Sequence, residues 1–193
     1  MPIEHGPTRN LTRSSGAHDR APAWSPDGEK IAYVSDAGGE DDVYWVDQDG
    51  SGSPERLTQR TSGRIDNLLF SPNGEHLTYS DQQGKLYLLD LTSKTSVEIA
   101  DDKAPFGLDP SWSPDSRYLA MSLADDNGLR SLWIYALDDA KLHRITDELW
   151  NETSPSWDPS GKFLFYLSDH EFAPQLAPSS STTSSTAKAR FSP

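Results

Sequence analysis

The sequence predicts an all-β protein that is built from repeated four-stranded antiparallel sheets. Three observations predict this class. A motif of an aromatic residue followed by a Pro-containing turn occurs four times, with the aromatic residue at positions 24, 70, 112 and 157. The same pattern of apolar residues follows each copy, and the copies are spaced evenly along the chain. Even spacing of several short strands, each bounded by turn signals, is typical of all-β architectures.

The motif itself predicts a tight turn between the first two strands of each unit. Pro presets φ at the second position of a type I turn, and Gly accepts the positive φ at its end. Ser116 replaces this Gly in the third copy, so we expect mild backbone strain there. The four copies are Trp24-Ser25-Pro26-Asp27-Gly28, Phe70-Ser71-Pro72-Asn73-Gly74, Trp112-Ser113-Pro114-Asp115-Ser116 and Trp157-Asp158-Pro159-Ser160-Gly161.

The remaining strands follow in register. Residues 30–35 and their equivalents form the second strand, and three copies continue with an aromatic-rich third strand and a short fourth strand that ends in segments such as Arg56-Leu57-Thr58. Units of about 40–45 residues with four strands each are the blades of a β-propeller. The repeated aromatic residue is expected to lie between blades, so Trp24→Ala should cost about 3–5 kcal/mol.

The repeat divides the chain into six predicted segments. Together the blade segments form an incomplete arc of about three full blades plus parts of two. Open ends of such an arc expose apolar faces, which predicts that the chain associates with itself or is poorly soluble. The predicted segments are 1–15, the last strand of a preceding blade; 16–60, 61–102 and 103–148, one blade each; 149–171, the first half of a further blade; and 172–193, a disordered Ser/Thr-rich tail.

Composition narrows the classes of function. The chain has 193 residues and a net charge of −13, with 17 Lys and Arg against 30 Asp and Glu. This balance argues against nucleic acid as a partner, and the absence of a long apolar run argues against membrane insertion. The chain has no Cys, which excludes disulfides, thiolate metal sites and a Cys nucleophile. No motif for a metal, a cofactor or a catalytic residue is present.

The quoted residues resemble the TolB/tricorn class of propeller repeats. Within this class they are most similar to a propeller segment of tricorn-type proteases, on the strength of Pro22-Ala23-Trp24-Ser25-Pro26-Asp27-Gly28, Ile31-Ala32-Tyr33 and Arg56-Leu57-Thr58. The resemblance implies a non-catalytic segment of a cytoplasmic serine peptidase, which acts as a scaffold and as an access channel for peptides. Its partners would be peptides and the remaining domains of the parent protein.

Two other functions share the same repeat. One is a TolB-like periplasmic propeller that serves as a protein-interaction module, and the other is the accessory propeller of a prolyl-oligopeptidase-type enzyme. The flanking domains of the parent would discriminate among the three.

The residues that precede each first strand are the candidate site. In propellers this strand lines the central channel, and loops at one end usually meet the ligand. The candidates for a polar channel lining are His18, Asp19, Arg20, Asp66 and Asp109. The alternative is that the Asp side chains cap turns between blades. The acidic clusters Glu40-Asp41-Asp42 and Asp101-Asp102 are interpreted as a solvated rim, and an acidic mouth that selects peptides is the alternative.

Overall fold

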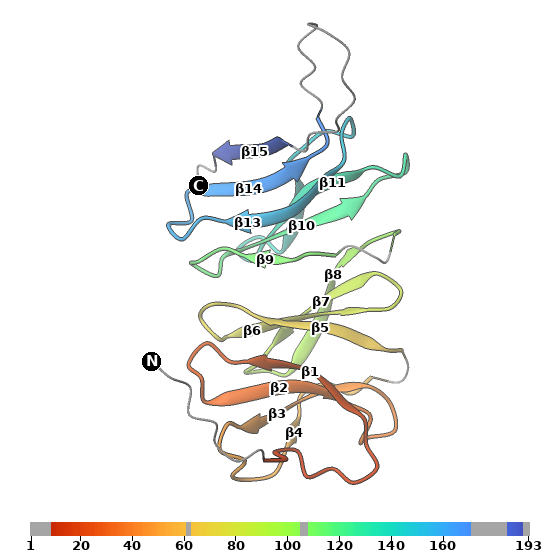
Figure 1. Cartoon of the computed structure of the whole chain (residues 1–193), viewed down its shortest axis with the longest axis vertical. Coiled ribbons are helices and arrows are strands. Elements are labelled where there is room, and N and C mark those ends of the chain that lie inside the picture. The colour runs from red at the N-terminus through yellow and green to blue at the C-terminus, as the bar shows by residue number, and fades with distance from the viewer. Residues whose placement is uncertain (1–8, 61–62, 105–107, 171–184, 191–193) are drawn as a thin grey trace, which may run out of the picture.

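The computed structural model describes residues 9–60, 63–104 and 108–170 in full, and the backbone of 185–190. This part of the chain contains fifteen strands and no helix, in four antiparallel sheets. Three sheets of four strands and one of three, stacked one on the next, confirm the predicted all-β propeller class, and the stack does not close into a ring (Figure 1).

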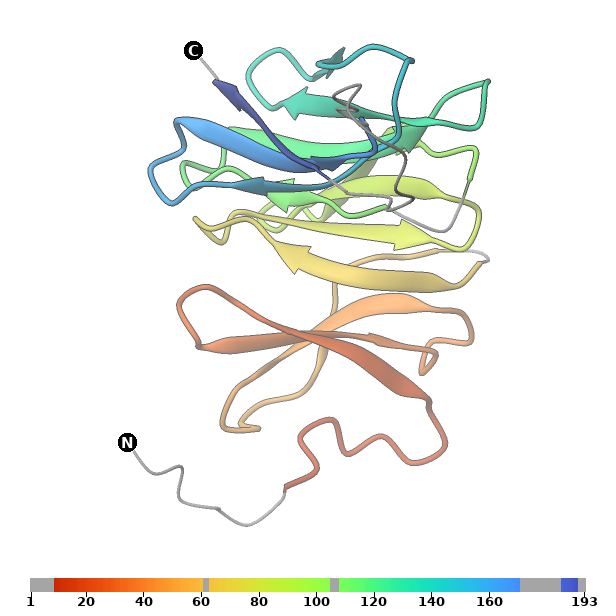
Figure 2. The ribbon, with the colours of Figure 1, turned by 45° about the horizontal axis from the view of Figure 1, so that its top comes forward.

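Each sheet is a meander in which strands follow one another in chain order. The first contains β1 (Asp19–Trp24), β2 (Lys30–Ser35), β3 (Asp42–Asp47) and β4 (Glu55–Arg56). The second contains β5 (Ile65–Phe70), β6 (His76–Asp81), β7 (Lys85–Asp90) and β8 (Thr95–Asp101). The third contains β9 (Ser111–Trp112), β10 (Tyr118–Ala124), β11 (Arg130–Ala136) and β12 (Lys141–Arg144). The fourth contains β13 (Glu152–Trp157), β14 (Phe163–Ser168) and β15 (Ser185–Arg190). Figure 2 shows the four sheets as successive layers.

The turn between the first two strands of each blade has the predicted geometry. In the first blade the N–H of Gly28 donates to the carbonyl of Ser25 at 2.9 Å, and Gly28 has a φ of 75°. The Ser25 hydroxyl donates to the Asp27 carboxylate at 2.5 Å and accepts from the N–H of Lys30 at 2.9 Å. Ser116 has a φ of 62°, which confirms the expected strained position in the third turn.

The segment that ends the first blade and the one that ends the third blade connect the short fourth strand to the third strand beside it. In the first blade the Nε–H of Arg56 donates to the carbonyl of Thr58 at 2.9 Å, and the hydroxyl of Thr58 accepts from the N–H of Val43 at 3.0 Å. Arg144 and Thr146 repeat the first contact in the third blade at 2.8 Å. Two side chains in each segment thus satisfy backbone groups that the short fourth strand leaves unpaired.

Most of the hydrophobic core lies between blades. Ala32, Val34 and Val43 of the first sheet form one buried cluster with Leu77 and Leu89 of the second. A second cluster joins the second and third sheets, and a smaller one joins the third and fourth. Each blade is therefore stabilised by its neighbours.

The aromatic residue at the end of the first strand is buried in the second and third blades but not in the first. Phe70 and Trp112 are each 8% exposed, whereas Trp24 is 58% exposed. The prediction that Trp24 is a core residue was wrong for this structure. The physical reason is that each aromatic residue packs on the preceding blade, and among the described residues no blade precedes the first.

Both ends of the arc differ from the expectation. Residues 9–18 contain no strand, although 1–15 were expected to supply one; 1–8 lie outside the described residues. At the other end, residues 185–190 of the tail pair with β14 over six positions, whereas the whole segment 172–193 was expected to be disordered. An unpaired strand edge offers a row of donors and acceptors to any segment without Pro, and 185–190 has none. The rest of the tail lies outside the described residues.

Candidate functional site

The first strands of neighbouring blades lie beside one another, so their N-terminal ends lie on the same side of the stack of sheets. β1 contacts β5, and β9 contacts β13. Three of these strands carry a β-bulge, with positive φ at Ala21, Asn67 and Ser154. A bulge bends the strand and redirects its side chains. In the first and second blades the bulge residue directly follows a candidate residue, Arg20 or Asp66.

A cavity of about 460 Å³ opens on this side of the first two blades, where β1 and β5 begin. It is lined by His18, which precedes β1, by Arg20 of β1, and by Arg64, which precedes β5 of the second blade. The connection between β2 and β3 contributes Asp36, Glu40 and Asp41. The cavity thus combines three carboxylates with two guanidinium groups and an imidazole.

An ion pair between Arg20 and Asp41 forms the wall of this cavity. The Asp41 carboxylate also accepts the backbone N–H of Ile65 at 3.0 Å, and Arg20 donates to the carbonyl of Ile65 at 3.3 Å. Burial raises the pKa of Asp41, but the hydrogen bonds from Arg20 and Ile65 outweigh it and hold the pKa below its usual value. The pair therefore stays charged and joins the first blade to the second.

The remaining carboxylates of the cavity are less engaged. The backbone N–H of His18 donates to Asp36 at 2.7 Å, which fixes the entry of the first strand. Glu40 is exposed at the rim. Carboxylates at an open rim attract cationic groups through their field, and salt weakens this attraction.

Asp19 lies on the other side of the first strand and does not line the cavity. Its carboxylate accepts the hydroxyl of Ser14. Burial raises the pKa of Asp19, and hydrogen bonds from Ser14, Ser35 and Thr12 reverse the effect and lower it. Burial, with Asp19 nearby, raises the pKa of Tyr33 to about 12. Asp19 therefore belongs to the packing of the N-terminal segment on the first blade.

Asp66 and Asp109 are also outside the cavity. Asp66 pairs with Arg64 at 3.1 Å, and both side chains are exposed. The carboxylate of Asp109 accepts the N–H of Ser154, the bulge residue of the next blade. Burial raises the pKa of Asp109, although the Ser154 hydrogen bond opposes this effect. Asp109 thus contacts the backbone of strand β13 in the next blade and does not line the cavity.

Of the five candidates, the structure brings His18 and Arg20 together and leaves Asp19, Asp66 and Asp109 apart. Sequence reasoning missed Asp36, which the pairing of β1 with β2 brings beside His18, and Arg64, which reaches the cavity because the second blade packs on the first. The expected solvated rim was wrong in part, since Asp42 and Asp102 are fully buried. Each forms an ion pair with an Arg of its region, Asp42 with Arg56 and Asp102 with Arg130 at 2.6 Å.

A second hollow lies where the last strand of the first blade leads into the second blade. Its two parts measure about 380 Å³ each and share Arg60 and Tyr79 in their walls. The guanidinium of Arg60 lies over the stacked rings of Tyr79 and Tyr87, 5.7 and 5.1 Å from their centres, and pairs with Asp81 at 3.3 Å. These contacts join the segment after β4 of the first blade to β6 and β7 of the second.

Within residues 9–60, 63–104 and 108–170, no group of three or more His, Asp or Glu side chains is arranged to hold a metal ion. No helix long and apolar enough to cross a membrane occurs in the described part of the chain. The residues of the cavity are suited to binding by charge and hydrogen bonding.

Comparison with known proteins decides the family. Residues 1–190 match the family model of the tricorn protease second β-propeller domain. The chain belongs to this family. It is 29% identical over 176 residues to tricorn protease homolog 1 of Streptomyces coelicolor, and the match covers 88% of the chain but 16% of that protein.

Solved structures agree on the fold of this tricorn-type propeller domain. The crystal structure of the tricorn protease matches 88% of the chain and 17% of its own length, with a TM-score of 0.73 and 18% identity. TolB from Acinetobacter baumannii matches 93% of the chain and 42% of its own length, with a TM-score of 0.60 and 21% identity. At these identities the likeness concerns the fold alone.

Proposed function

We propose that this chain is a non-catalytic propeller segment of a tricorn-like serine peptidase in the cytoplasm, where it serves as scaffold and as an access channel for peptides. The remaining domains of the parent would be its partners. The observation that carries the proposal is the match to the tricorn second propeller over residues 1–190. A charged cavity where the first strands of the first two blades begin supports it. The chain spans 16% of its Streptomyces relative, so the peptidase activity belongs to the proposal as well.

The chemistry of the cavity favours peptides with cationic groups near the point of entry. Arg20 and Asp41 neutralise each other, which leaves Asp36 and Glu40 as the carboxylates that face a ligand together with Arg64. A space of about 460 Å³ suits one or two side chains rather than a whole folded partner. Binding at such an open, charged site is weak and sensitive to salt, which suits passage better than retention.

A fluorescence anisotropy experiment with two labelled peptides tests this role. The peptides have the same length and composition, except that one carries Lys where the other carries Glu. We expect the Lys peptide to bind the 193-residue chain more tightly at low salt, and we expect Glu40→Gln to weaken its binding about two- to fivefold.

Glu29→Gln is the matched control, because it removes the same charge from an exposed position at the far end of β1, in the β1–β2 turn. It should leave peptide binding unchanged. Equal binding of the two peptides, or equal losses in both variants, would contradict the access role. Cleavage of a fluorogenic peptide by the chain alone would contradict its non-catalytic character.

A further inference from the structure

Three of the five Gln residues of the chain line one part of the hollow between the first and second blades, a space of about 380 Å³. They are Gln59, Gln82 and Gln83, and all three side chains are exposed. Their carboxamides make no hydrogen bond to any part of the chain that the structure describes. A carboxamide carries an acceptor oxygen and two donor hydrogens. The hollow therefore offers hydrogen-bonding groups that the fold itself does not use.

One wall of this space is the turn between β6 and β7, which carries Gln82 and Gln83. The Asp81 carboxylate holds the turn, since it accepts the backbone N–H of Gln83 at 3.0 Å and that of Lys85 at 3.1 Å. The N–H of Gly84 also donates to the Asp81 carbonyl at 3.0 Å. The two carboxamides thus stand on a backbone that is already ordered, which lowers the cost of binding a ligand.

A second wall is the segment after β4, which carries Gln59. The buried carboxylate of Asp42 fixes the backbone on both sides of this residue. It accepts the hydroxyl of Thr58 at 2.6 Å and the backbone N–H of Arg60 at 2.8 Å. The three carboxamides therefore line the space from two blades, each on a segment that hydrogen bonds hold in place.

The charged and aromatic groups of this space already have partners. Arg60 pairs with Asp81 at 3.3 Å, and Lys85 pairs with Glu98 at 2.7 Å. The two Tyr rings stack on each other with their centres 5.0 Å apart. The carboxamides are the main groups left for a ligand, and they are neutral. A peptide main chain suits them, because every residue except Pro carries one donor and one acceptor.

The space adjoins the charged cavity, since Gly63 and Gln82 lie in the walls of both. A peptide with a cationic side chain beside Glu40 can therefore continue past Gln82 into the space between the blades. The donors and acceptors of an extended segment are unpaired, whereas those of a folded protein are paired within it. Carboxamides at this place distinguish the two states of a polypeptide without reading its sequence.

We infer that Gln59, Gln82 and Gln83 bind an extended polypeptide segment by its main chain. The inference rests on the proposed access role and names the state of the peptide that the site accepts. The acidic rim attracts cationic groups, and the carboxamides hold the chain between them whatever its side chains are.

Fluorescence anisotropy with the labelled Lys peptide and the 193-residue chain tests the inference. A second peptide has the same side chains, with two internal amides replaced by esters, so that it lacks two N–H donors. We expect the ester peptide to bind at least about twofold more weakly. Gln59→Ala and Gln83→Ala should each weaken binding of the amide peptide about two- to tenfold, the effect of one neutral hydrogen bond. Both variants should weaken binding of the ester peptide less.

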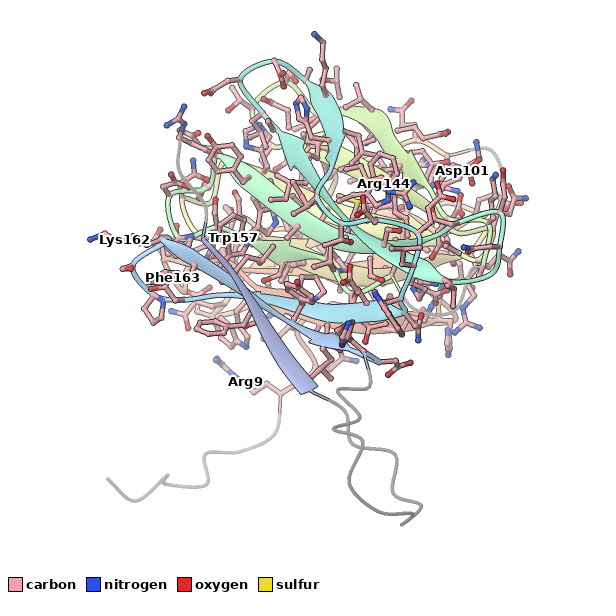
Figure 3. All side chains as sticks on the ribbon, turned by 90° about the horizontal axis from the view of Figure 1, so that it is seen from above. Arg9, Asp101, Arg144, Trp157, Lys162 and Phe163 are labelled. Carbon is pink, nitrogen blue, oxygen red and sulfur yellow. The ribbon has the colours of Figure 1, made fainter. Side chains whose placement is uncertain are left out.

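Gln48→Ala is the matched control, because it removes an exposed carboxamide at the opposite end of the strands. Figure 3 looks along the stack and shows these two ends. Asp101, which pairs with Lys85 of the hollow, marks one end, and Phe163, which follows a motif turn, marks the other. Gln48 follows β3 at the motif-turn end, where Asp47 pairs with Lys30. Gln48→Ala should bind both peptides as the wild type does.

The outcomes separate this inference from the proposed function. If Glu40→Gln weakens binding but Gln59→Ala and Gln83→Ala do not, the access role stands and the inference is wrong. If the two Gln variants weaken binding while the Lys and Glu peptides bind equally, the main-chain site stands and selection by charge is wrong. Equal binding of the amide and ester peptides would overturn the inference, and no binding of either peptide would overturn both proposals.

A competition experiment checks the preference for extended chains. A small disulfide-bonded protein should not displace the labelled peptide, whereas the same protein, reduced and alkylated, should displace it from the wild type and less effectively from Gln83→Ala. Equal displacement by the folded and the unfolded form would contradict main-chain recognition.

Discussion

The hydroxyl of Ser116 accepts a hydrogen bond from the backbone N–H of Asn73, and the two atoms are 3.0 Å apart. Ser116 occupies the positive-φ position at which the other three motif turns have Gly. In two of those turns the Gly lies against a Pro of the preceding blade: a Cβ on Gly74 would stand 3.6 Å from Pro26. The turns of successive blades touch in a row, and in the third blade a hydrogen bond offsets the loss of glycine's conformational freedom.

Substitution of Ser116 should separate the two effects. Ser116→Ala keeps the strained φ and removes the hydrogen bond, so we expect a loss of about 1–2 kcal/mol in the free energy of unfolding. Ser116→Gly removes the bond but relieves about 1 kcal/mol of left-handed strain, and should lie closer to wild type. Urea unfolding of the three proteins checks the order. Equal stability of Ser116→Ala and wild type would show that the bond contributes nothing.

Replacing the repeated aromatic residue by Ala should lower the free energy of unfolding much more in the third blade than in the first. Trp112 is buried against the second blade, so Trp112→Ala should cost about 3–5 kcal/mol. Trp24 is exposed, and Trp24→Ala should cost less than about 1 kcal/mol. Thermal unfolding at a protein concentration that keeps single copies apart compares the two. A large loss in Trp24→Ala under these conditions would contradict the observed exposure.

The buried carboxylate of Asp42 should be required for the stability of the first blade. It accepts the Thr58 hydroxyl at 2.6 Å and the Arg60 N–H at 2.8 Å, and it pairs with Arg56. We expect Asp42→Asn to cost about 2 kcal/mol or more, since hydrogen bonds to a charged group are the strong ones.

Asp47→Asn is the control for this loss. Asp47 forms an ion pair with Lys30 at 2.8 Å, and both side chains are partly exposed, unlike the fully buried Asp42. Surface pairs contribute about 0–1 kcal/mol. If both variants lost the same stability in urea unfolding, burial of the Asp42 carboxylate would not be the cause.

Stability should fall as the pH rises through the titration of Asp109. Burial raises the pKa of this carboxyl above 3.8, so the folded state holds its proton more tightly than the unfolded state does. The stabilising contribution is complete below pH 3.8 and is lost as the pH passes the raised value. Asp109→Asn keeps an acceptor for the Ser154 N–H without the charge. We expect it to gain stability relative to wild type between pH 3.5 and pH 7, and parallel pH profiles would contradict this.

The repeat made most of the fold predictable, because turns and strands depend on residues that are near one another in the sequence. Gly28, Ser116 and the second strands follow from residues a few positions away. The partners of Asp41, Asp42 and Asp102 did not follow, since each lies on a segment that only the folded blades bring near. The cavity illustrates the same limit. His18 and Arg20 lie at the start of the first strand, and Asp36 lies beside them through strand pairing, but Arg64 reaches them only because the second blade packs on the first.

The strand at the tail was hidden for a different reason. Nothing in the composition of residues 185–190 favours a strand, and the edge of β14 provides the hydrogen-bonding partners. Exposure of Trp24 was equally hidden, because the motif is the same in every blade and only the presence of a neighbour decides burial.

The contact of Arg56 and Thr58 with the third strand of their own blade spans 15 residues, and Arg144 and Thr146 repeat it in the third blade. Hydrogen bonds between residues about 15 positions apart thus stabilise each of these two blades from within. The other stabilising contacts are apolar contacts with the blades on either side. Such a molecule behaves as a linear array in which order can start in any unit and spread. Duplication or loss of one unit leaves the internal fastening of the others intact, so the number of units can drift during evolution while the local architecture persists.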